Sequence, residues 1–173
     1  MEAIIDVLKF TLPGLLVFAT AYFLLKTLMD NEQKKRLMES KLNNQKIITP
    51  LRLQAYERLI LFLERITPDQ IILRTYDTSY SVGDLQSALI QTILAEYEHN
   101  ISQQVYVSGK TWGAIKITKE NMVKIVNQCA ARLEKDAPAV ELTRVILESI
   151  MQLDREPTAT AIELLKIEAS QYF

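Results

Sequence analysis

Three short groups of residues in this chain are of types that could carry chemistry. Val107–Thr111 reads V-S-G-K-T, and its last three residues match the end of a phosphate-binding loop. Glu96-x-x-His99 has the helical spacing at which a carboxylate and an imidazole share a metal ion. Cys129, the single cysteine, is the one possible thiol nucleophile. Each of these hints needs supporting residues around it.

The residues before V-S-G-K-T do not complete a phosphate-binding loop. Such a loop needs a first glycine five positions before the second, between a strand and a helix. That position holds Gln104, and the preceding segment E-Y-E-H-N-I-S-Q-Q-V-Y reads as the end of a helix. We therefore predict no nucleotide binding here. The alternative is a tight turn between two helices, in which Ser108 caps, Gly109 bends the chain and Trp112 is buried.

Neither the Glu96-x-x-His99 motif nor Cys129 has the further residues that a metal site or a nucleophile needs. A di-iron site of this kind uses a pair of Glu-x-x-His motifs, and one chain with a single histidine cannot supply both. Cys129 falls on the apolar stripe of its helix, where a small core residue is expected. We predict no catalytic residue, no metal and no cofactor, and therefore a protein that is not an enzyme.

Composition sets broader limits. The 173 residues include 20 Lys and Arg against 21 Asp and Glu, a net charge of −1, so no overall field favours nucleic acid. Glycine and proline are scarce, with four and five residues, which favours helices over turn-rich β structure. One cysteine excludes an intrachain disulfide.

The first thirty residues are the most apolar part of the chain. The stretch from Phe10 to Leu25 carries no charge, and with its apolar flanks it predicts one membrane-spanning helix over about residues 4–29. A cleaved signal peptide, with Ala19-Thr20-Ala21 as its cleavage site, and a buried core helix are the alternatives. The residues predicted to lie in lipid are Phe10, Leu12, Leu15, Leu16, Val17, Phe18, Tyr22, Phe23, Leu24 and Leu25.

Basic residues follow this stretch and predict its orientation. Positive charge gathers on the cytoplasmic side of a membrane helix. The N-terminus is therefore expected in the periplasm, and the rest of the chain in the cytoplasm, of a bacterium with this protein in its inner membrane. The residues that set this topology, and that could contact anionic lipid, are Lys26, Lys34, Lys35, Arg36 and Lys41.

The remaining chain has helical period throughout. The expected fold is all-α: a transmembrane anchor (1–29), a juxtamembrane helical stalk and linker (30–49, with the linker at 43–49), and a compact cytoplasmic bundle of about five helices (50–173). A short strand at Gln70–Tyr76 is the one exception considered. Ser81-x-x-Asp84 and Thr67-x-x-Gln70 resemble capping boxes. The predicted helices are Leu51–Ile66, Val82–Tyr106, Gly109–Leu133, Pro138–Leu153 and Thr158–Tyr172.

Polar faces with charges of both signs could receive a partner. Such faces suit docking onto another helix, although a solvated surface is the commoner use. The residues of this possible partner surface are Glu57, Arg58, Glu64, Arg65, Glu96 and His99.

Two stretches carry a family resemblance: L-R-L-Q-A-Y-E-R-L-I-L-F-L-E-R-I-T-P (Leu51–Pro68) and Q-T-I-L-A-E-Y-E-H-N-I-S-Q-Q-V-Y-V-S (Gln91–Ser108). Together they resemble an uncharacterised family of small membrane-anchored proteins of Bacteroidota. The resemblance implies a bacterial inner-membrane setting and no activity.

Three functions remain open at this point. The first is a non-enzymatic, membrane-tethered interaction module, a scaffold or accessory subunit whose partners are membrane lipid and a membrane protein or further copies of the chain. The second is an enzyme or small-ligand carrier with a cavity between its helices. The third is a module that senses anionic lipid through its basic cluster.

Overall fold

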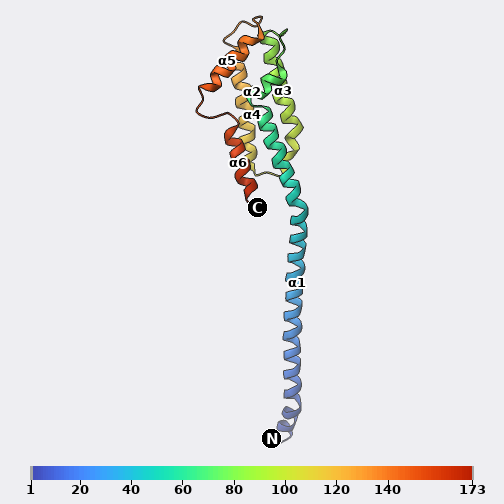
Figure 1. Cartoon of the computed structure of the whole chain (residues 1–173). Coiled ribbons are helices and arrows are strands. Elements are labelled where there is room, and N and C mark those ends of the chain that lie inside the picture. Colours follow the sequence, from blue (N-terminus) through green and yellow to red (C-terminus); the bar gives the residue numbers. More distant parts are fainter. Residues whose placement is uncertain (1, 173) are drawn as a thin grey trace. The chain divides into compact units, whose positions relative to one another are not determined.

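A computed structural model describes residues 2–172, and the side chains of residues 2–10, 12 and 13 lie outside this description. Within the described range the chain forms six α-helices, one 3-10 helix and no strand (Figure 1). The all-α prediction is therefore confirmed. The chain divides into two compact units, Met1–Ile48 and Thr49–Phe173.

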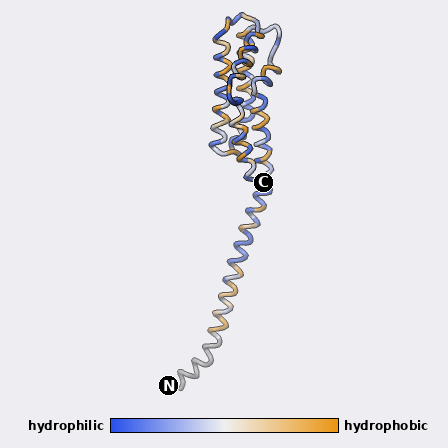
Figure 2. Tube along the Cα trace, turned by 60° about the vertical axis from the view of Figure 1, so that its left-hand side comes forward, coloured by the Kyte–Doolittle hydropathy of each residue, from blue (hydrophilic) through white to orange (hydrophobic). Residues whose placement is uncertain are grey.

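Helix α1 (Glu2–Arg65) contributes to both units. It continues without a break through residues 43–49, so the segment predicted to be a linker is helical. Pro50 also lies inside the helix, although a proline there removes one backbone hydrogen bond. The hydropathy of α1 changes along its length: in Figure 2 hydrophobic positions are frequent just after the grey part of the tube, and hydrophilic ones follow.

The prediction of a transmembrane helix is wrong. Among the residues that the structure describes, no helix combines the length and the apolar character needed to cross a bilayer. The uncharged run ends at Leu25, and Lys26 and Asp30 follow in the same helix, whereas a bilayer needs about 20 mainly apolar residues. The side chains of Phe10 and Leu12 lie outside the described part of the chain. The predicted inner-membrane location and its topology are overturned by the same finding.

The second unit contains the end of α1 and the other helices. Four of the predicted helices begin and end within a few residues of helical segments in the structure, whereas the predicted helix Leu51–Ile66 is only the end of α1. Residues 70–75 of the segment considered as a strand are part of α2. The elements after α1 are α2 (Pro68–Thr75), α3 (Val82–Asn100), the 3-10 helix η1 (Ile101–Val105), α4 (Gly109–Ala130), α5 (Ala139–Met151) and α6 (Ala159–Ser170).

One apolar core holds this bundle together. Each helix contributes residues spaced three or four positions apart, because that spacing places them on one face. Helix α4 packs against α3, α5 and α6, and α2 packs against α3 and α5. The largest fully buried side chains are Phe62, Leu59, Leu63, Ile66, Ile71, Leu85, Leu89, Ile93, Ile115, Met122, Leu142 and Ile146.

Short backbone contacts join the starts of α3 and α5. The N–H of Val82 donates to the carbonyl of Ala137 at 2.8 Å, and the N–H of Ala139 donates to the carbonyl of Tyr80 at 3.0 Å. Ser81 caps α3 in the capping box predicted with Asp84. The Thr67 box is not formed, because the Thr67 hydroxyl donates instead to the carbonyl of Glu64 at 2.8 Å.

Helix α5 is apolar on two sides, as its sequence indicates. Leu142 and Ile146 face the core, and both are buried. Val140 and Leu147 are exposed, and Met151 retains 85% of its surface. The helix is therefore packed on one face and leaves a short apolar stripe on the other.

We expect Leu89→Ala to lower the free energy of unfolding by about 2–5 kcal/mol, because Leu89 is fully buried and its truncation leaves a cavity. Urea unfolding of the full chain, followed by circular dichroism, measures the change. Leu73→Ala is the matched control: Leu73 is 77% exposed, and its truncation should change stability by less than about 0.5 kcal/mol. Equal losses in the two variants would contradict the core described here.

Candidate functional site

The V-S-G-K-T segment forms the start of helix α4. Ser108 is the N-cap residue, and its hydroxyl accepts a hydrogen bond from the N–H of Thr111 at 3.2 Å, as predicted. Gly109 is the first helical residue and has no positive φ, and a Cβ there would meet nothing within 4 Å. The glycine therefore serves no close backbone approach of the kind that a phosphate loop needs.

A carboxylate from α6 occupies this helix start. Glu168 accepts hydrogen bonds from the N–H of Ser108 at 2.7 Å and from the Ser108 hydroxyl at 2.6 Å. The hydroxyl of Thr111 donates to the same carboxylate, and so does the Tyr56 hydroxyl of α1, at 3.1 Å. Negative charge is favourable at a helix N-terminus, so Glu168 fills the place where an external anion could bind.

These contacts change the acidity of Glu168. Burial raises the pKa of the carboxyl group, but hydrogen bonds from Ser108, Thr111 and Tyr56 favour its charged form more strongly. The net result is a pKa below the usual value. Glu168 is therefore a stable acceptor of hydrogen bonds at neutral pH.

The acidity of Tyr56 changes in the opposite sense. Burial, followed by the negative charge of Glu168 and the hydrogen bond to it, raises the pKa of Tyr56 to about 12, against an opposing effect of Arg52. Tyr56 therefore remains a protonated donor at all physiological pH values. The pair is suited to joining α1 to α6 and holds no proton ready for transfer.

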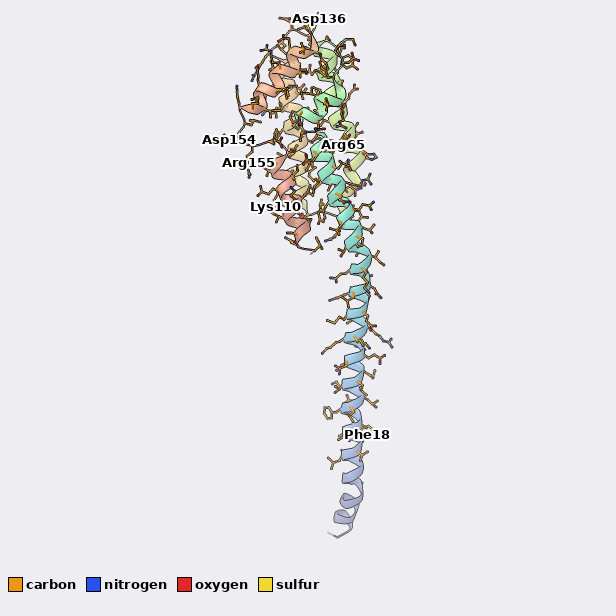
Figure 3. All side chains as sticks on the ribbon, in the orientation of Figure 1. Phe18, Arg65, Lys110, Asp136, Asp154 and Arg155 are labelled. Atoms are coloured by element: carbon orange, nitrogen blue, oxygen red, sulfur yellow. The ribbon has the colours of Figure 1, made fainter. Side chains whose placement is uncertain are left out.

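A pocket of about 360 Å³ opens beside this carboxylate. Its walls come from the start of the bundle portion of α1, from the segment between η1 and α4, and from the C-terminal half of α6. Figure 3 labels Lys110, one of its lining residues, at the start of α4. On the α1 side, the guanidinium of Arg52 donates to the Tyr172 hydroxyl and lies 5.0 Å from the centroid of that ring.

A second polar cluster involves the predicted partner surface. The carboxylate of Glu96 in α3 forms ion pairs with the guanidinium groups of Arg65 in α1, at 3.4 Å, and Arg74 in α2, at 3.1 Å. The Glu96 side chain is only 16% exposed. Arg74 also donates to the carbonyl of Arg65 at 2.6 Å. The charges of Arg65 and Glu96 are thus used inside the chain, where they hold three helices together.

The other residues of that surface are less connected. Arg58 donates to Nε2 of His99 at 3.2 Å, so this ring nitrogen is an acceptor in a contact between α1 and α3. Glu57 and Glu64 are exposed. Among the side chains that the structure describes, no group of three or more His, Cys, Asp or Glu is arranged to hold a metal ion.

Two further residues named from the sequence lie in the core region. Cys129 is buried, and its thiol is 3.5 Å from the Ser149 hydroxyl. Trp112 is half-buried, and its ring stacks on Tyr97 with the centroids 5.6 Å apart. Neither residue lines the pocket beside Glu168.

The basic cluster of α1 belongs to the other unit. Its members, Lys26, Lys34, Lys35, Arg36 and Lys41, are all exposed. Arg36 pairs with Glu32 one turn earlier at 2.8 Å. An exposed pair of this kind adds a few tenths of a kcal/mol to a helix.

Glu168 is a site residue that was not predicted from the sequence. A signal existed: Ala161 and Leu165 mark the buried face of α6, and Glu168 follows at the next position on that face. A carboxylate at a core-facing position must find donors. The spacing of α6 therefore indicated a buried polar contact, but it could not name the start of α4 as the partner.

These features define an all-α helical bundle with polar clusters between its helices and a pocket at one end. The chain matches a protein family described as a family of unknown function (DUF7935) over residues 2–172, and it belongs to that family. No curated protein matches it, and neither does any solved structure. The resemblance to an uncharacterised family is thereby confirmed.

We expect Glu168→Gln to lower the free energy of unfolding at pH 7 by about 1–3 kcal/mol, because it replaces an ionised acceptor by a neutral amide. The contribution of a carboxyl group with a lowered pKa is present above its ordinary value of 4.5 and is lost as pH falls through the folded-state pKa. As the pH falls, the Glu168→Gln variant should therefore lose less stability than the unsubstituted protein. Urea unfolding at neutral and acidic pH measures both effects.

Glu163→Gln on the same helix is the control for this experiment. Glu163 pairs with Arg155 at 3.6 Å, and both side chains are exposed, so little stability should be lost. A Glu168→Gln variant as stable as Glu163→Gln, with an unchanged acid profile, would contradict the role assigned to Glu168.

A second substitution tests the cluster around Glu96. Glu96→Gln should cost about 1–2 kcal/mol, since it leaves two arginines beside a partly buried neutral group. Added salt should reduce the difference from the unsubstituted protein. Glu98→Gln, at an exposed position on the same helix, provides the comparison. Thermal unfolding at low and high salt gives the result, and identical melting of the two variants would refute the prediction.

Proposed function

We propose that this protein is a non-enzymatic helical interaction module, a scaffold or accessory subunit of a protein assembly. The supporting observation is the apolar surface of α1 between Leu15 and Met29, the segment in which Figure 3 labels Phe18. Its large side chains keep 55–73% of their surface exposed within the described chain. These are Leu15, Leu16, Val17, Phe18, Tyr22, Phe23, Leu24, Leu25, Leu28 and Met29.

An apolar surface of this extent favours association. Contiguous exposed apolar patches on protein chains mark sites where another molecule binds. Fully burying one large apolar side chain contributes about 1.5–3 kcal/mol. Ten such residues therefore suffice to offset an association cost of roughly 4–15 kcal/mol, even if many are only partly covered.

The distribution of these side chains indicates how many neighbours are needed. Successive residues of an α-helix are turned by about 100°, so the runs 15–18 and 22–25 point in all directions around α1. A single partner helix covers only one face of another helix. Covering this segment therefore takes at least two helices, which supports a subunit role in a larger assembly over a simple pair.

The partner we propose is a helical protein, or several further copies of this chain, in a bacterial cell as the resemblance to proteins of Bacteroidota implies. Polar contacts could add specificity beyond the apolar segment. Glu57 and Glu64 of the bundle are exposed. They remain proposed partner contacts, whereas the charges of Arg65 and Glu96 already satisfy each other.

The test compares the full chain with a variant carrying Phe18→Ser, Phe23→Ser and Leu24→Ser. We expect the unsubstituted protein to purify as an assembly above its monomer mass of 19.8 kDa. The triple variant should lose that partner, because it loses about 1.5–3 kcal/mol of burial at each site. Light scattering after gel filtration and crosslinking with mass spectrometry measure mass and composition.

Leu73→Ser serves as the control, since it removes a leucine of α2 in the bundle that is at least as exposed as the three substituted residues. It should leave the assembly intact. A monomeric, partner-free unsubstituted chain would refute the proposed function, and so would an assembly that survives the triple substitution.

A further inference from the structure

The pocket beside Glu168 carries more positive charge than its own carboxylate balances. Its charged lining residues are Arg52, Lys110 and Glu168, two cations and one anion, for a net charge of +1. Glu168 is already engaged by four donor groups from Ser108, Thr111 and Tyr56. Neither cation of the pocket forms an ion pair with it among the contacts of the described residues.

Several other arginines of the bundle have a carboxylate partner, although Arg58 contacts His99 and no ion pair is present for Arg132 among the described residues. Arg74 pairs with Glu96, Arg144 pairs with Glu141 at 2.7 Å, and Arg155 pairs with Glu163. Arg52 instead contacts only a neutral group, the ring and hydroxyl of Tyr172. A guanidinium group has five N–H donors in a planar fork, so most of its capacity remains unused in the described structure.

Lys110 is the second unbalanced charge. Its side chain lines the pocket and has no hydrogen-bond or ion-pair partner in the part of the chain that the structure describes. The pocket is therefore bordered on the α1 side and on the α4 side by a cation without an opposite charge. An anionic ligand supplies what both cations lack.

We propose that this pocket binds a small organic carboxylate with an apolar body. A volume of about 360 Å³ falls in the range of small-molecule sites, roughly 300–1,000 Å³. Arg52 binds the carboxylate, for which its planar fork is suited, and Lys110 adds charge from the other side. Leu164 and Ile167 of α6, both lining residues, supply an apolar wall for the ligand body.

The charge balance selects the kind of anion. A monoanionic carboxylate neutralises the net charge of +1, whereas a phosphate monoester carrying nearly two charges leaves an excess beside Glu168. The N–H and the hydroxyl of Ser108 are no part of the proposed site, because Glu168 already accepts a hydrogen bond from each. The site lies within the bundle unit and does not rest on the proposed assembly through α1.

Titration of the full chain with hexanoate tests the proposal. Fluorotyrosine introduced at the seven tyrosines reports on the pocket by ¹⁹F NMR, because Tyr106 and Tyr172 line it and Tyr22 and Tyr80 do not. We expect hexanoate to shift the Tyr106 and Tyr172 signals, with calorimetry giving the affinity. Hexanamide has the same body without charge, and hexyl phosphate has the same body with more charge. Both should bind at least about tenfold more weakly.

Two variants assign the recognition to the cations. Arg52→Gln should abolish hexanoate binding, and Lys110→Gln should weaken it by roughly tenfold, in line with the loss of one charge contact. Lys110 has no hydrogen-bond or ion-pair partner among the side chains that the structure describes, so we expect its substitution to leave the fold unchanged. Lys116→Gln, at an exposed position of α4 outside the pocket lining, should bind hexanoate normally.

Four results would overturn the proposal. They are an absence of hexanoate binding, equal binding by the Lys110→Gln and Lys116→Gln variants, equal binding of hexanamide, and tighter binding of hexyl phosphate than of hexanoate. The first two reject the site, the third rejects recognition of charge, and the fourth rejects a carboxylate as the ligand class.

Discussion

The carboxylate of Glu168 is partly buried where α6 packs, and an ionised group that loses part of its hydration is destabilised unless hydrogen bonds replace it. The start of α4 has the donors that this requires, because the first N–H groups of a helix have no partner within it. The Tyr56 hydroxyl adds a donor from α1. One acceptor therefore fixes where three helices meet, and the pocket lies against this junction.

Apolar packing alone would not specify that junction. Burial of apolar surface is nearly independent of direction, so it favours a compact bundle without choosing one alignment of its helices. Hydrogen bonds and ion pairs are directional. Glu168 aligns α6 with α4, and Glu96 aligns α3 with α1 and α2 through Arg65 and Arg74. The two carboxylates thus help to fix how the helices are aligned, which apolar burial alone does not determine.

Periodicity predicted most of the helical bundle, because a helix that buries one face must repeat its apolar residues every three or four positions. It failed where local patterns are ambiguous. Gln70–Tyr76 contains a short apolar run that suits a strand or a helix equally, and contacts with α3 and α5 decide for α2. The charge-free segment before Lys26 suggested a membrane span, but the described helix continues into charged residues too soon.

The pocket was beyond prediction for a different reason. Its residues come from three separate parts of the chain, and Arg52 and Tyr172 are 120 positions apart. No local pattern in one sequence connects such positions. What could be predicted was narrower: Ser108 as a helix cap and the V-S-G-K-T segment as a turn between helices. Glu168, which accepts hydrogen bonds from Ser108 in that turn, could be identified only in the folded structure.

The contact between Arg52 and Tyr172 also decides where the protein can be labelled. A fluorescent protein or affinity tag fused directly behind Tyr172 would crowd the aromatic ring that covers the guanidinium. The connection between α5 and α6 is a better insertion point, since residues 152–156 are exposed and lie outside the pocket lining. A reporter placed there leaves both ends of the bundle free to be studied.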